Sequence, residues 1–128
     1  TIKTNRGKKR YTKMVQKFLE DELTPELSRL TQSEGRILIK LIHRQTGIST
    51  YDLVKQLRNG FRAFIYNTTA RFFNLNLKTE FMPEINIDDY FIEDIIQRSI
   101  RDNLIEYNKP MKRYDLFELK KLWDNQKK

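Results

Sequence analysis

Apolar side chains recur at steps of three and four residues through most of this 128-residue chain. That spacing buries one face of a helix, whereas a half-buried strand needs strict alternation. Only residues 74–87, "NLNLKTEFMPEINI", alternate apolar and polar side chains, and they contain Pro83. The pattern predicts an all-α fold, a compact bundle of five to six helices with one extended connector around residues 74–87.

Local start and stop signals divide the first half of the chain. Residues 8–23 predict an amphipathic helix, and Thr24 followed by Pro25 predicts a second, shorter helix, because proline is favoured at the first helical position. The capping box "TQSE" at 31–34 predicts a third helix to about Thr46, with Gly47 as its left-handed C-cap. The apolar stripe of the first helix is Tyr11, Met14, Val15, Phe18, Leu19 and Leu23.

"STYD" at 49–52 repeats the start signal and predicts a long fourth helix. Its stretch 55–73 holds five aromatic and four cationic side chains and no acid. Gly60 lies inside this helix, where glycine is costly, so we expect either a bend or, as the preferred interpretation, a close helix crossing. One face is predicted to be core: Val54, Leu57, Phe61, Phe64 or Ile65, Thr68 and Phe72.

Two more helices are predicted after the connector, over residues 88–104 and 114–124. The first begins with acids and ends with arginines, the order that the helix dipole favours. Its expected apolar stripe is Phe91 or Ile92, Ile95, Ile96, Ile100 and Leu104, and that of the last helix is Leu116, Phe117, Leu119, Leu122 and Trp123.

The length fits one domain, which we place at residues 8–125 behind a flexible basic arm at 1–7. The chain has no cysteine, which excludes disulfides, thiol catalysis and zinc bound by cysteine. Apolar runs are too short to span a bilayer, and a chain that opens at Thr1 without a signal peptide is expected to be a processed product.

The net charge of +8 comes in alternating blocks. Lys and Arg minus Asp and Glu gives +7 over residues 1–17, −4 over 18–35, +7 over 36–78, −6 over 79–106 and +4 over 107–128. Blocks of opposite sign can neutralise one another in the folded chain, which makes nucleic-acid binding less favoured.

Two basic stripes are the main candidate for a binding surface. The first is Arg36, Lys40 and Arg44, and the second is Lys55, Arg58 and Arg62. Such stripes suit a carboxylate, a phosphate or an anionic polymer, with Tyr51 and Tyr66 available for stacking. The preferred alternative is a solvated face that the acidic fifth helix partly neutralises.

The remaining titratable groups carry weaker hypotheses. His43 is the only histidine, and a structural role at the helix surface is favoured over catalysis or metal binding. Asp88, Asp89, Glu93 and Asp94 crowd one region, and Asp89 with Glu93 are weak candidates for holding a hard cation. Acids that complement the helix dipole and meet basic helices are favoured, so we expect no metal site and no cofactor.

Residues 34–81 contain "ILIKLI" with Arg44, "TG" at 46–47, "STYDLVKQLR" and "FRAF". This stretch resembles a family of exported Bacteroidota proteins catalogued as a domain of unknown function, and the likeness extends over most of residues 8–105. The resemblance implies a precursor with a signal peptide and residence in the periplasm or cell envelope. It makes envelope proteins or anionic envelope polymers more favoured partners than nucleic acid.

The leading functional hypothesis is a non-enzymatic envelope module, for binding or scaffolding, that presents a basic helical surface to an anionic or protein partner. The second is a nucleic-acid-binding helical domain whose arm "KTNRGKKR" follows phosphates. The third is a hydrolase that uses the acids between Asp88 and Asp94.

Overall fold

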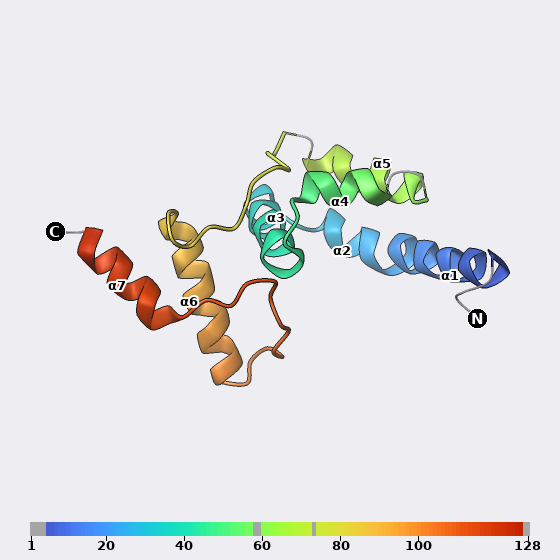
Figure 1. The fold of residues 1–128 in the computed structure, drawn as a ribbon. Helices are drawn as coiled ribbons and strands as arrows, with labels where there is room; N and C mark the ends of the chain where they lie inside the picture. The colour runs from blue at the N-terminus through green and yellow to red at the C-terminus, as the bar shows by residue number, and fades with distance from the viewer. Residues whose placement is uncertain (1–4, 58–59, 73, 127–128) are drawn as a thin grey trace. The chain divides into compact units, whose positions relative to one another are not determined.

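The computed structural model describes residues 5–57, 60–72 and 74–126. Its regular structure is helical, with no strand among these residues, so the all-α prediction is confirmed (Figure 1). None of the described helices is both long and apolar enough to cross a bilayer. The elements are α1 (Asn5–Phe18), the π-helical turn η1 (Leu19–Leu23), α2 (Thr24–Ser28), α3 (Gln32–Thr46), α4 (Thr50–Leu57), α5 (Arg62–Phe72), α6 (Ile87–Arg101) and α7 (Leu116–Gln126).

The chain divides into two compact units. Unit 1 comprises residues 1–38 and 50–78, and unit 2 comprises residues 39–49 and 79–128. The start of α3 therefore belongs to unit 1 and its later turns to unit 2. The expected basic arm at 1–7 and single domain at 8–125 stay predictions.

The start of α2 is set by a proline. Pro25 has no N–H to donate to a helical carbonyl, so the ordinary ladder cannot continue through it. The chain widens by one residue instead: the Thr24 N–H bonds to the Leu19 carbonyl, and the Thr24 hydroxyl donates to the same oxygen at 2.8 Å. The helix start predicted at Thr24 and Pro25 is confirmed, with η1 as the wide turn that precedes it. Thr24 is the first residue of α2 and not its N-cap, because its hydroxyl donates back to Leu19.

Unit 1 is built around α5, which packs on α2 and η1 and lies beside α4 (Figure 1). Phe64 and Phe72 of α5 are buried together with Leu75. Phe72 also fixes a close approach, because a Cβ atom added at Gly35 of α3 would lie 2.6 Å from its ring. The interior position predicted for these aromatic side chains is confirmed.

The predicted long fourth helix is two helices in the structure. Helix α4 ends at Leu57, Gly60 lies in a turn, and α5 begins at Arg62. Among the described residues outside its immediate chain neighbours, no atom lies within 4 Å of a Cβ built at Gly60, so the expected close crossing there is wrong. Gly60 instead lies in a turn, and its carbonyl accepts a hydrogen bond from the side-chain amide of Gln16. The close approach to an aromatic ring is found at Gly35.

Unit 2 begins with the later turns of α3. The helix ends at Thr46 as predicted, and Gly47 takes the left-handed conformation with φ of +80°, which confirms its role as C-cap. Residues 74–86 hold neither helix nor strand. Of these residues, Phe81 is 1% exposed and stacks edge-on against Tyr114, with ring centroids 5.6 Å apart.

Helix α6 differs from its prediction in the face that it buries. Asn86 caps its start by accepting the Asp89 N–H at 3.1 Å. Of the alternatives Phe91 and Ile92, Phe91 is 50% exposed and Ile92 is partly buried, whereas the expected stripe is wrong at Ile95, which is 56% exposed. Asp89 and Glu93 are the buried residues of this helix. Leu104, the expected end of the stripe, lies beyond the helix and is exposed.

The two glycines provide a test of the packing in unit 1. We expect Gly35→Ala to lower the free energy of unfolding by about 1 kcal/mol or more, because the overlap with Phe72 outweighs the helix preference of alanine. Gly60→Ala is the control and should leave the free energy of unfolding within about 0.5 kcal/mol. Urea titration followed by far-UV circular dichroism measures both, and equal stabilities would contradict the close approach.

The capping box at the start of α3 gives a test by pH. The Thr31 N–H donates to the Glu34 carboxylate at 2.9 Å, and the Thr31 hydroxyl accepts the Glu34 N–H at 3.1 Å. Hydrogen bonding of the Glu34 carboxylate by the backbone N–H of Thr31, and secondarily by its hydroxyl, lowers the pKa of Glu34 from its ordinary 4.5. Charged Glu34 thus stabilises the fold above its unfolded-state pKa, and this contribution is lost as pH falls through the lowered value.

We expect Thr31→Ala to raise the Glu34 pKa part of the way, since the backbone N–H remains. An NMR titration of the Glu34 carboxyl in both proteins measures this change. An unchanged pKa would show that the hydroxyl has no part in the box.

Candidate functional site

Two ion pairs connect α3 and α6 inside unit 2. Lys40 Nζ lies 2.6 Å from Asp89 Oδ1, outside hydrogen-bond geometry, so this contact is ionic. The Arg44 guanidinium forms a fork with Glu93, with Nε 2.8 Å from Oε1 and Nη2 3.1 Å from Oε2. Lys40 and Arg44 lie four residues apart on α3, as Asp89 and Glu93 do on α6, and residues at that spacing share one helix face. The two ion pairs therefore follow one another along the helices as two rungs.

The carboxylates of these rungs are further satisfied by neutral donors. The Met82 N–H donates to Asp89 Oδ2 at 2.9 Å, and Gln97 Nε2 donates to Glu93 Oε2 at 2.7 Å and to the Tyr114 carbonyl at 2.8 Å. Asp89 is 1% exposed and Glu93 is fully buried. Within the described ranges, no group of three or more His, Asp and Glu side chains is placed to hold a metal ion.

His43 occupies a structural position on α3. Its Nδ1 accepts the Phe81 N–H at 2.9 Å, which leaves the proton of the neutral ring on Nε2, 3.5 Å from a Glu80 carboxylate oxygen. Of the other acids, Asp88 is exposed and Asp94 lies 2.9 Å from Arg98 in the same helix. The crowded acids thus separate into a buried pair and two at the surface.

The candidate basic residues fall into different environments. Lys40 and Arg44 are neutralised by acids of α6 in unit 2. For these two residues, the alternative prediction of a face partly neutralised by the acidic helix is confirmed. Arg36, Lys55 and Arg62 are exposed in unit 1. Arg58 lies outside the described residues.

Tyrosine side chains accompany the exposed cations of unit 1. The Tyr51 ring is 40% exposed, with Lys55 Nζ 5.6 Å and Lys78 Nζ 4.8 Å from its centroid. Both distances are within the range of cation–π attraction. Tyr66 is 77% exposed and lies one turn after Arg62 on α5. Tyr51 therefore carries a small cationic cluster, and Tyr66 is free to stack on a partner.

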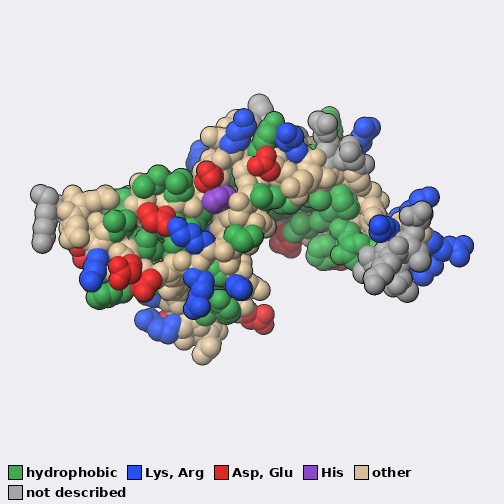
Figure 2. All heavy atoms as spheres, viewed as in Figure 1, with side chains coloured by type: hydrophobic (Ala, Val, Ile, Leu, Met, Phe, Trp, Pro, Cys, Tyr) green, Lys and Arg blue, Asp and Glu red, His purple; other side chains and the backbone are tan. Residues whose placement is uncertain are grey.

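Helix α1 holds a feature that the sequence analysis missed. It contains six Lys and Arg residues and no acid, and blue side chains gather around this part of unit 1 (Figure 2). None of the six pairs with an acid among the described residues. The predicted apolar stripe divides: Val15 and Leu19 are half-buried, whereas Tyr11, Met14 and Phe18 are 54%, 66% and 57% exposed. In the sequence, this feature is indicated by the width of the apolar stripe and by the row of cations without acids beside it.

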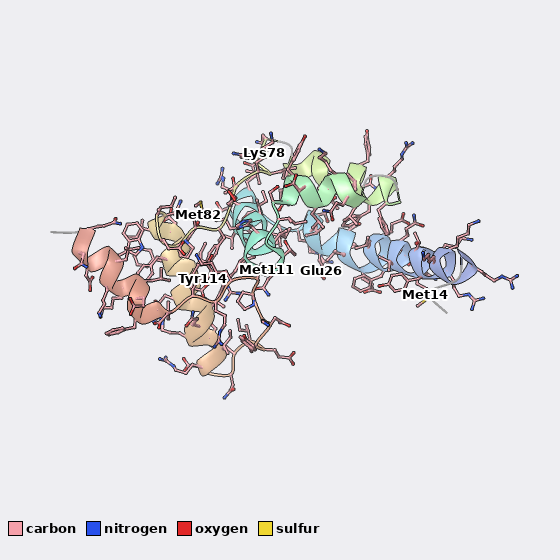
Figure 3. All side chains as sticks on the ribbon, in the orientation of Figure 1. Met14, Glu26, Lys78, Met82, Met111 and Tyr114 are labelled. Carbon is pink, nitrogen blue, oxygen red and sulfur yellow. The ribbon has the colours of Figure 1, made fainter. Side chains whose placement is uncertain are left out.

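A cleft of about 260 Å³ lies at the Arg44–Glu93 pair in unit 2. Arg101, Tyr107 and Arg113 are among the residues that line it. Tyr114, labelled in Figure 3, also lines it, and burial raises the pKa of its hydroxyl, with the negative charge of Glu84 adding to the effect. The cleft is open to solvent beside the Arg44–Glu93 pair, and apolar side chains such as Ile100 and Pro110 contribute to its lining.

The two kinds of ion pair predict different stabilities of variants. Arg44→Met leaves the Glu93 carboxylate buried without its cation, so we expect a loss of about 3 to 5 kcal/mol in the free energy of unfolding. Arg44→Met with Glu93→Leu should recover most of that loss, because no charge then stays buried. Arg98→Ala is the control and should cost at most about 1 kcal/mol, since its pair with Asp94 is partly exposed. Equal losses for Arg44→Met and Arg98→Ala would contradict the buried pair.

A protein family matches most of the chain. No curated protein and no solved structure matches the chain. The family described as "Domain of unknown function (DUF4294)" matches residues 1–98, which covers α1 to α5 and most of α6. This confirms the resemblance to a catalogued domain of unknown function. The chain belongs to the DUF4294 family of domains of unknown function.

Proposed function

We propose that this protein is a non-enzymatic binding or scaffolding module of the cell envelope that presents a basic helical surface to an anionic partner. The observation that carries the proposal is the charge of α1, with six cations and no acid. Counter-charges are absent along this helix in the part of the chain that the structure describes. The cations remain available to a partner.

In unit 2, by contrast, several cations are paired with acids. There Lys40, Arg44, Arg98 and Lys112 each lie within 3 Å of an acid's oxygen. In α1 the like charges repel one another and the acids nearest in sequence begin only at Glu20 of η1, so a polyanion relieves that repulsion while it releases its own counterions. The free energy of binding therefore favours α1 over these paired cations of unit 2.

The proposed surface extends from α1 to exposed residues elsewhere in unit 1. These are Arg36, Lys55 and Arg62, with Tyr51 and Tyr66 as the flanking aromatic side chains. Lys40 and Arg44 do not belong to it, because their charges are committed to Asp89 and Glu93. The envelope location is supported by the resemblance to exported proteins, and it favours an envelope polyanion over nucleic acid.

A salt titration tests this proposal. The full chain should bind labelled polyphosphate at low salt, with an affinity that falls steeply as salt rises. Lys9→Glu, Lys13→Glu and Lys17→Glu combined should weaken binding by about tenfold or more and lower the salt slope by about two to three. Fluorescence anisotropy at several salt concentrations measures both quantities.

A matched variant separates the α1 surface from net charge. Lys109→Glu, Lys120→Glu and Lys121→Glu in unit 2 change the total charge by the same amount and should leave most of the affinity. Equal weakening by both triple variants, or no binding at low salt, would overturn the proposal. A labelled single-stranded oligonucleotide in the same titration tests the nucleic-acid alternative, which requires clearly tighter binding to that probe.

A further inference from the structure

We propose that α1 docks on the surface of an anionic lipid bilayer, lying along the headgroup region with Tyr11, Met14 and Phe18 turned toward the acyl chains. This inference rests on the proposed function and names its partner. It goes beyond charge, because the apolar stripe of α1 is as distinctive as its cations.

The first step is the direction of the stripe. Tyr11, Met14 and Phe18 are spaced by three and four residues, so they lie along one side of the helix. All three are more than half exposed. Met14 extends from α1 on the side away from α4 and α5 (Figure 3). This stripe is therefore directed away from the interior of unit 1.

The second step is what holds the helix in that orientation. Val15 and Leu19 are half-buried in unit 1, and the Gln16 side-chain amide donates to the Gly60 carbonyl. The inner side of α1 is thereby fixed to its own unit. Only the outer side is open to a partner, and a planar surface needs no more than one side of a helix.

The third step is the position of the cations relative to the stripe. Arg10 precedes Met14 by four residues and Lys17 follows it by three, so both lie next to Met14 on the helix surface. Long basic side chains can lay their stems along apolar surface while the charged ends reach the phosphates. A stripe of apolar residues bordered by Lys and Arg is the pattern of helices that lie in a membrane interface.

Charge also decides among the other occupants of this face. A second copy would bring another acid-free row of cations against the first, which is repulsive. A nucleic acid would use the cations and leave the parallel stripe of Tyr11, Met14 and Phe18 in water. A protein groove that wraps a helix would compete with unit 1 for the side that carries Gln16. An anionic bilayer satisfies the charge and the apolar side together.

Vesicle flotation of the full chain tests the inference. We expect binding to vesicles of phosphatidylglycerol and phosphatidylcholine and weak binding to phosphatidylcholine alone. Tyr11→Ser, Met14→Ser and Phe18→Ser combined should lower the partition onto anionic vesicles by about tenfold or more, because the apolar contribution is lost. The same variant should keep most of its affinity for polyphosphate, which also shows that its basic surface is intact.

The control variant removes three apolar side chains outside α1 that are on average at least as exposed: Ile85→Ser, Leu104→Ser and Phe117→Ser. It should bind anionic vesicles like the unmodified protein. Polyphosphate binding without binding to anionic vesicles would overturn the bilayer inference and leave the proposed function standing. So would equal vesicle binding by the α1 serine variant and the unmodified protein. Failure to bind either probe would overturn both.

Discussion

The fork between Arg44 and Glu93 is the interaction on which unit 2 depends. A carboxylate removed from water is tolerated only where its charge and its lone pairs are met, and here two guanidinium nitrogens and the Gln97 amide meet them. Lys40 and Asp89 add a second, purely ionic contact one turn away. The fixed geometry of both rungs sets which side of α6 turns inward, and that choice leaves Phe91 and Ile95 at the surface.

This constraint changes the meaning of the net charge. The acidic block at 79–106 is partly consumed by two cations of the block at 36–78, so neither block is wholly available to a partner. The first block, at 1–17, has no such compensation along α1. The net charge of +8 therefore does not show how strongly the uncompensated positive charge differs from one part of the chain to another. The positive potential that a partner meets is expected to be strongest at α1.

The sequence was sufficient where the cause is local and insufficient where it is tertiary. Pro25, the Thr31–Glu34 box and Gly47 act on the backbone next to them, and the helix starts and the helix end that they predict are confirmed. The inward face of α6 was not, since apolar periodicity ranks Phe91 above Glu93 unless the cation opposite is known. Likewise, neither Gly35 nor Gly60 indicates from sequence which of them meets an aromatic ring. For the same reason, the sequence did not show that Lys40 and Arg44 pair with acids and so do not belong to the candidate surface.

The two features of α1 act over different distances, and this gives them separate roles. Attraction between its cations and an anionic surface extends about 8 Å at physiological salt, so it acts before contact. Burial of Tyr11, Met14 and Phe18 contributes only after contact, because it depends on the removal of water. In the proposed docking on an anionic bilayer, charge therefore governs approach and the apolar stripe governs retention. A helix with the cations alone would bind any polyanion reversibly, whereas the exposed stripe selects a partner that has an apolar interior.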